Sequence, residues 1–134
     1  MDDTIERLRA VNMDVPTPLE LPDEDLLVEI EEAMLIGLPR EYKQFLLEVS
    51  DVVYGALEPA TAADSGSHTY LPDLAARAWD EGLPRYLIPV CESPLGFYAI
   101  NPEGVIVYWA EGEMTDDEWP TIWDWAEAVW LEGA

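Results

Sequence analysis

The stretch from Gly96 to Trp109 constrains the fold of this chain more than any other part of the sequence. It holds two short runs of β-branched and aromatic residues, GFYAI and VIVYW, separated by the tetrapeptide NPEG. Strong turn formers between two such runs are typical of an antiparallel β-hairpin. We therefore predict strands over residues 96–100 and 105–109, joined by a turn at residues 101–104.

A third short apolar run, YLIPVC at residues 86–91, precedes this hairpin. Pro89 cannot donate a backbone hydrogen bond, so this strand is expected at an edge of the sheet or at a bulge. Further upstream, residues 59–70 are small and polar and predict a loop. His68 has no second His or Cys near it in this loop, so we expect it to be exposed to solvent. The sequence leaves the role of His68 and of the loop open.

Helical periodicity dominates the N-terminal half. Pro39 suits the first position of a helix, Gly82 suits the end of one, and three prolines make residues 15–22 a linker. Apolar residues recur three and four positions apart in segments that predict helices over residues 4–12, 23–37, 38–49 and 71–81.

Four of the six tryptophans crowd into twelve residues at the end of the chain, where Pro120 marks the start of a last helix. We expect most of these indoles to cover the sheet. One helix face hardly has room for four buried indoles, so Trp123 or Trp119 is expected near the surface as a contact for a partner.

These elements predict an α+β fold with a helix-rich N-terminal half, a central β-hairpin in a mainly antiparallel sheet surrounded by helices, and a C-terminal helix. The chain has 134 residues, of which 49% are hydrophobic, and this is the size and composition of one domain over residues 1–134. It lacks a long apolar run, and Asp2, Asp3 and Glu6 stand where a signal peptide would carry bases, so we expect a cytosolic protein.

The charge is strongly negative. Asp and Glu number 29 against six Lys and Arg, the formal net charge is −23, and no base follows Arg85. Such a surface repels phosphate, which disfavours nucleic acid and anionic membranes as partners and favours a cationic protein. The alternative from charge alone is that the acids only keep the protein soluble.

No catalytic or cofactor motif occurs in the sequence. There is no Gly-rich phosphate loop, no HExxH and no arrangement of Ser, His and Asp at a known spacing. Cys91 lies in an apolar run and is expected to be buried without a chemical role. We therefore expect a chain that is not an enzyme and that needs no cofactor or metal.

The order of the elements resembles the SUKH superfamily, which includes many bacterial immunity proteins and fungal cell-wall-synthesis regulators of the Smi/Knr type. The resemblance covers roughly residues 22–131. Within it, an acidic helix at residues 29–37 is followed by an "LP..Y..FL" signature. Residues 50–55 depart from the Asn-Gly-Gly type of turn that often follows this signature. The residues that carry the resemblance are Leu38, Pro39, Tyr42, Phe45 and Leu46, then Leu83, Pro84, Ile88, Pro89, Val90, Gly96 and Trp109.

The resemblance implies a domain that acts by binding another protein. In bacterial members the partner is commonly a toxin domain, often a nuclease, which the immunity protein blocks, and a cationic nuclease would suit this acidic chain. A regulatory or scaffolding module with a partner other than a toxin is the alternative. The identity of the partner and the oligomeric state stay open. Besides Trp123, we expect the partner to contact an acidic loop that follows Trp109 and contains no base, at Glu111, Glu113, Asp116, Asp117 and Glu118.

Overall fold

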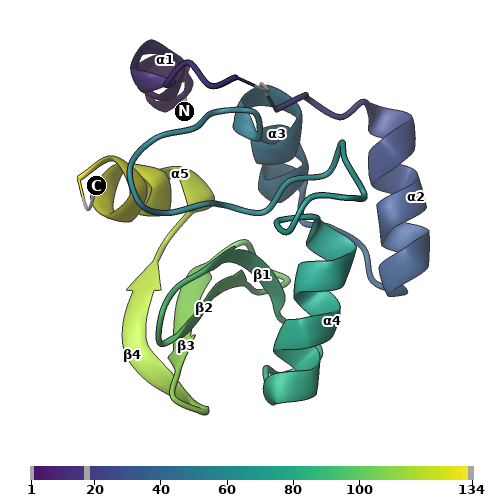
Figure 1. Ribbon diagram of the computed structural model, residues 1–134. Coiled ribbons are helices and arrows are strands. Elements are labelled where there is room, and N and C mark those ends of the chain that lie inside the picture. Colours follow the sequence, from purple (N-terminus) through teal and green to yellow (C-terminus); the bar gives the residue numbers. More distant parts are fainter. Residues whose placement is uncertain (1, 17–18, 133–134) are drawn as a thin grey trace.

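The computed structural model describes residues 2–16 and 19–132, and these form an α+β fold (Figure 1). The four strands make one antiparallel sheet in the order β1-β2-β3-β4. The elements in chain order are α1 (Asp2–Val11), α2 (Glu24–Met34), α3 (Arg40–Val49), α4 (Leu71–Glu81), β1 (Ile88–Glu92), β2 (Gly96–Ile100), β3 (Ile106–Ala110), β4 (Glu113–Trp119), α5 (Ile122–Trp125) and the π-helical segment η1 (Ala126–Leu131).

The predicted hairpin is confirmed as β2 and β3. Phe97 pairs with Trp109 and Ala99 with Val107, and these side chains are buried on one face of the sheet. The turn at residues 101–104 is closed by the side chain of Asn101, whose Oδ1 accepts hydrogen bonds from the amides of Glu103 and Val105, each at 3.0 Å. The two apolar runs and the turn formers between them thus act as the sequence predicted.

β1 lies at one edge of the sheet, and its pairing with β2 shifts register between Pro89 and Cys91. Both features confirm the expectation for a strand that contains proline. The edge is covered by the segment before α4, because Pro59 forms an isolated bridge with Cys91 and the amide of Ala60 donates to the carbonyl of Val90 at 2.8 Å. Beneath it, the hydroxyl of Tyr42 in α3 donates to the carbonyl of Pro89 at 2.8 Å.

The opposite edge is formed by β4, which the sequence did not predict. Residues 113–119 (EMTDDEW) were expected to be an acidic loop, and they pair instead with β3. Acids are depleted in strands, so local propensity argued against one. A two-residue turn at Glu111 and Gly112, with φ values of 54° and 84°, brings the chain back against β3. Pairing with β3 therefore makes residues 113–119 a strand in spite of their low propensity.

The helix boundaries follow the predicted ones closely. Asp23 caps α2 by accepting from the amide of Leu26 at 2.8 Å, and Gly82 ends α4 with a φ of 117°. Two expectations were wrong in detail. α2 ends at Met34 with Leu35 in the left-handed region, before Gly37, and Pro39 is the residue before the first turn of α3 instead of a part of it.

The aromatic core lies where α3 meets the C-terminal helix. Phe45 contacts the rings of Trp123, Trp125 and Trp130, with centroids 5.6, 6.4 and 5.9 Å away. α1 lies beside this helix (Figure 1), and an ion pair joins Arg7 to Glu127. The first and last helices are therefore held together across the length of the chain.

Candidate functional site

The five acidic residues expected to contact a partner lie on β4 and on the turn before it. Glu111 is the first residue of the two-residue turn, Glu113 pairs with Ala110, and Glu118 pairs with Val107. All five carboxylate residues are exposed. The strand therefore presents a run of negative charge along an edge of the sheet, and we call Glu111, Glu113, Asp116, Asp117 and Glu118 the β4 carboxylates.

A bulge in β4 holds the middle of this run away from the regular ladder. The register shifts between Val107 and Trp109, and across that shift the hydroxyl of Thr115 donates to the carbonyl of Tyr108 at 2.9 Å. The same hydroxyl accepts from the amide of Asp117 at 3.2 Å. The side chain of Thr115 thus replaces ladder hydrogen bonds, and Asp116 and Asp117 project from the bulge into solvent.

None of the β4 carboxylates forms an ion pair with any residue in the described ranges. The bases are used elsewhere, as Arg9 pairs with Asp51, Lys43 with Glu31 at 3.4 Å and Arg77 with Glu92 at 3.2 Å. Within the described ranges, four of the six bases thus pair with carboxylates of other segments, and none of these pairs involves β4.

Beside the β4 carboxylates, the sheet face opposite Phe97 and Trp109 carries three half-buried aromatic side chains, and we call it the outer face. Its other end is covered, because Ile100 and Ile106 are fully buried and the Trp125 ring lies 5.5 Å from that of Tyr98. The rings of Tyr98 and Tyr108 stack with centroids 4.5 Å apart, and Trp119 meets Tyr98 edge-on at 5.7 Å. Burial raises the pKa of Tyr98, and the neighbouring acidic groups of Tyr108, Cys91 and Asp117 raise it further. An aromatic patch edged by carboxylates is the composition of a protein-binding surface.

Trp123 does not lie on this surface. Its side chain is only 5% exposed, so the expectation of an exposed indole on the last helix was wrong for Trp123. The helix face holds its indoles because Trp119 belongs to β4 and does not compete for the space. The indole Nε1 atoms of Trp123 and Trp125 are buried with no hydrogen-bond partner in the described part of the chain.

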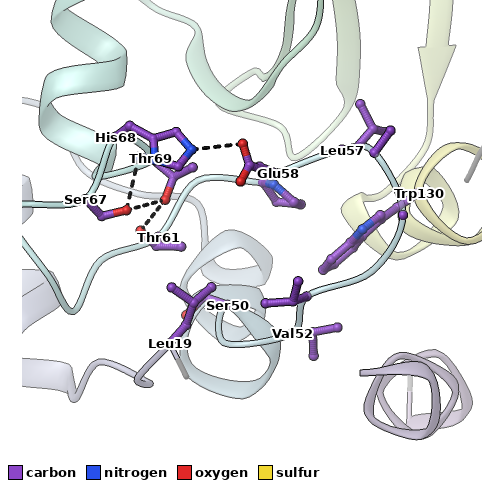
Figure 2. Close-up of a pocket in the computed structure, with 14 residues that line it drawn as sticks. Leu19, Ser50, Val52, Leu57, Glu58, Thr61, Ser67, His68, Thr69 and Trp130 are labelled. Carbon is purple, nitrogen blue, oxygen red and sulfur yellow. Dashed lines mark hydrogen bonds and ion pairs between the residues drawn. The ribbon is translucent and has the colours of Figure 1, made fainter. Parts of the chain in front are cut away.

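A pocket of about 280 Å³ lies under the loop that joins α3 to α4 (Figure 2). The hydroxyls of Thr61, Ser67 and Thr69 form a chain along it, with links of 2.8 and 2.9 Å. His68 Nε2 lies 2.8 Å from an oxygen of Glu58, and its side chain is 74% exposed, as expected. The loop is more ordered than its composition indicated, because residues 60–62 and 69 are buried.

This pocket holds no nucleophile bonded to a base among the described residues. The hydroxyl of Ser67 bonds to Thr69 and not to His68, which leaves His68 without a group to deprotonate. Cys91 is buried, and burial raises the pKa of its thiol to about 12. Within the same ranges no group of three or more His, Cys, Asp and Glu residues is placed to hold a metal ion.

The structure adds functional candidates that the sequence did not single out. These are Tyr98 and Tyr108, which were recognised only as parts of apolar runs. Trp119 beside them is half-buried and was already one of the two indoles expected near the surface. The place of the two tyrosines on the outer face follows from the register of β2 with β3, in which Tyr98 pairs with Tyr108. Because β4 was not predicted, Trp119 could not be placed beside these two tyrosines.

The comparisons with known proteins agree with this fold. The model of the family SUKH_5, described as SMI1-KNR4 cell-wall, matches residues 1–131. A crystal structure of a protein from Pseudomonas syringae pv. tomato superposes with a TM-score of 0.96 at 52% sequence identity, over 98% of this chain and 99% of that one. The comparison with curated proteins gave no match. No helix in the described ranges is both long and apolar enough to cross a membrane.

Proposed function

This chain belongs to the SMI1-KNR4 cell-wall family SUKH_5, and from that premise we propose that residues 1–134 form one protein-binding domain without enzymatic activity. Its function in this proposal is that of a cytoplasmic immunity protein. It neutralises a cognate bacterial toxin, of which a nuclease is the class that best fits the charge. The domain binds the toxin as a protein and binds neither nucleic acid nor membrane.

One observation carries this proposal, namely that the β4 carboxylates are exposed and have no ion-pair partner within the described ranges. A nuclease holds phosphate with Lys and Arg, so its active site attracts a protein that offers carboxylates in place of phosphates. A net charge of −23 also raises the rate of encounter with a cationic partner. The acidic strand would then occupy the phosphate site of the toxin.

The test is the affinity for the toxin encoded by the neighbouring reading frame, measured by calorimetry. Changing Asp116→Asn, Asp117→Asn and Glu118→Gln together removes three charges from β4 without removing bulk, and we expect binding to weaken about a hundredfold. Raising the salt concentration is expected to weaken binding of the natural chain steeply and that of the variant less.

The matched control removes three charges from exposed positions on α2, which lies across the molecule from β4 (Figure 1). The control changes are Asp25→Asn, Glu29→Gln and Glu32→Gln, and they are expected to lower the affinity by less than about threefold. Equal losses in the two variants would mean that only the overall charge matters. An affinity that neither variant nor salt alters would contradict the proposal.

A groove between α2 and α3 supports the alternative, a regulatory or scaffolding domain whose partner is not a toxin. It measures about 480 Å³ and includes Val28, which is 50% exposed, and Leu47, the apolar residue on the polar side of α3. The change Leu47→Asp separates the two functions. It is expected to abolish binding of a partner that occupies the groove and to leave the affinity for a toxin bound at β4 unchanged.

A further inference from the structure

The two edges of the sheet differ in whether their backbone groups are available. At β1, Pro89 offers no amide, and the segment at Pro59 and Ala60 occupies the edge. At β4, no backbone hydrogen bond in the described ranges joins residues 113–119 to any segment other than β3. The outer side of β4 is therefore an open strand edge, which is a template for pairing with another strand.

The register shows which amides point outward. The turn at Glu111 and Gly112 closes on the pair of Ala110 and Glu113, and in a two-residue hairpin this pair exchanges both ladder hydrogen bonds. Alternation along β3 then makes the pairs of Trp109 with Met114 and of Val107 with Glu118 non-hydrogen-bonded ones. The amides of Met114 and Glu118 consequently face away from β3.

The charges on β4 select the strand that can pair there. A second copy of this chain would bring its own β4 carboxylates beside the first set, and like charges on facing strands repel. The same repulsion excludes acidic strands in general. A strand rich in Lys and Arg would instead bring cations beside acids on both faces of β4, because Glu113 pairs with Ala110 and Glu118 with Val107, and these two partners face opposite sides of the sheet.

We propose that β4 binds its partner by strand addition, in which an extended, lysine- and arginine-rich segment of the partner pairs with the open edge and extends the sheet to a fifth strand. This proposal rests on the proposed function in that both place the partner at β4. It goes further in making the backbone of β4, and not only its carboxylates, the binding element. The half-buried ring of Trp119, which lies on β4 itself, would flank the added strand.

Hydrogen exchange measured by NMR tests the proposal directly. The probe is a peptide of about ten residues that alternates lysine with valine or threonine, titrated into the full chain labelled with nitrogen-15. We expect the amides of Met114 and Glu118 to exchange at least about tenfold more slowly in the bound state. A peptide that binds while these two amides exchange as before would overturn strand addition.

Two control peptides separate backbone pairing from charge attraction. The first has the same sequence with N-methyl groups on the alternate residues that would donate to β4, and it keeps every positive charge. The second replaces the lysines by glutamates. We expect neither to bind measurably. Binding of the methylated peptide as tight as that of the parent would show attraction by charge alone and would overturn the proposal.

Two substitutions at Met114 test whether its outward amide takes part in binding. Met114→Pro removes one outward amide, which proline can do at an edge position without loss of the β3 pairing, whereas Met114→Ala keeps the amide. The proline variant is expected to bind the peptide and the toxin at least about tenfold more weakly than the alanine variant. Circular dichroism and the melting temperature check that both variants fold.

These outcomes are distinguishable from those of the charge variants. Equal affinities of the proline and alanine variants, together with a loss on neutralising Asp116, Asp117 and Glu118, would leave the proposed function standing and overturn strand addition. Loss of toxin binding in the proline variant alone, with both variants folded, would support strand addition.

Discussion

The two edge strands of the sheet occupy equivalent places in the topology, and they are built in opposite ways. Four of the five residues of β1 are buried and its edge is covered by the chain itself, whereas no residue of β4 is buried and its edge is open. Edge strands invite pairing with other chains. The edge at β1 is thus covered by other parts of the chain, whereas the edge at β4 is protected from pairing only by its negative charge. The backbone of β4 is therefore the one of the two that another strand can reach.

The largest effect on this comparison is expected from Gly96→Ala, because Gly96 lies in β2, between the two edges. A Cβ atom there would lie 2.0 Å from the carbonyl oxygen of Trp109, so the β2 and β3 backbones would have to separate. We expect a loss of about 3 kcal/mol or more in the free energy of unfolding, measured with urea. In Gly112→Ala the new Cβ meets nothing within 4 Å, and only the cost of a positive φ, about 1 kcal/mol, is expected. Similar losses in the two variants would contradict this account.

Alkaline pH is expected to weaken the covered edge. Burial raises the pKa of Cys91 to about 12, against about 8.5 in the unfolded chain, and burial and Cys91 also raise the pKa of Tyr42. A group that stays protonated in the folded state contributes stability that falls as the pH rises above its unfolded pKa. For Cys91 we expect a loss of about 1–2 kcal/mol between pH 8 and pH 10, and urea unfolding at the two pH values checks it. The variant Cys91→Ala should lose less over the same interval, and an equal loss would contradict the assignment to Cys91.

Single hydroxyl groups provide a matched comparison of the two edges. Tyr42→Phe leaves the buried carbonyl of Pro89 without its donor, and a loss of about 1–3 kcal/mol is expected. Thr115→Val removes the donor to Tyr108 at β4, where water can take its place, and about 0.5–1 kcal/mol is expected. Thermal unfolding of both variants checks the order, and a larger loss at Thr115 would mean that β4 is the more tightly held strand.

The smallest effect on stability is expected from the β4 carboxylates. The changes Asp116→Asn, Asp117→Asn and Glu118→Gln together should alter the free energy of unfolding by less than about 0.5 kcal/mol, and in the stabilising direction, because they relieve repulsion in an anionic chain. The same triple variant is expected to lose toxin binding. A marked destabilisation would show that these side chains hold the fold instead of a partner.

The same two edges show how far the fold follows from the sequence. The run at residues 86–91 predicted β1 and its irregular edge, because apolar β-branched residues and a proline act locally. β4 was missed because its residues are acidic, and only pairing with β3 makes them a strand. The acids that we propose as partner contacts could still be named, since a segment with five acids and no base is visible without knowledge of the sheet.

The sequence could not predict that Tyr98 and Tyr108 lie beside the acidic strand, again because this depends on how the strands pair. Whether Tyr98 faces the core or the solvent depends on the register of the sheet, and a shift of one residue exchanges the faces. Trp123 or Trp119 was expected near the surface because four indoles were counted on one helix. The count was wrong because it included Trp119, which belongs to β4.

The position of Trp119 suits it as an intrinsic fluorescent probe of binding at β4. Three other indoles, Trp123, Trp125 and Trp130, are buried in the core, so we expect their emission to change mainly when the chain unfolds. Trp119 is half-buried beside Tyr98 at the end of the open edge, so its fluorescence reports on what covers that edge. Colour shifts and quenching of tryptophan emission can therefore follow association at β4 without any attached dye.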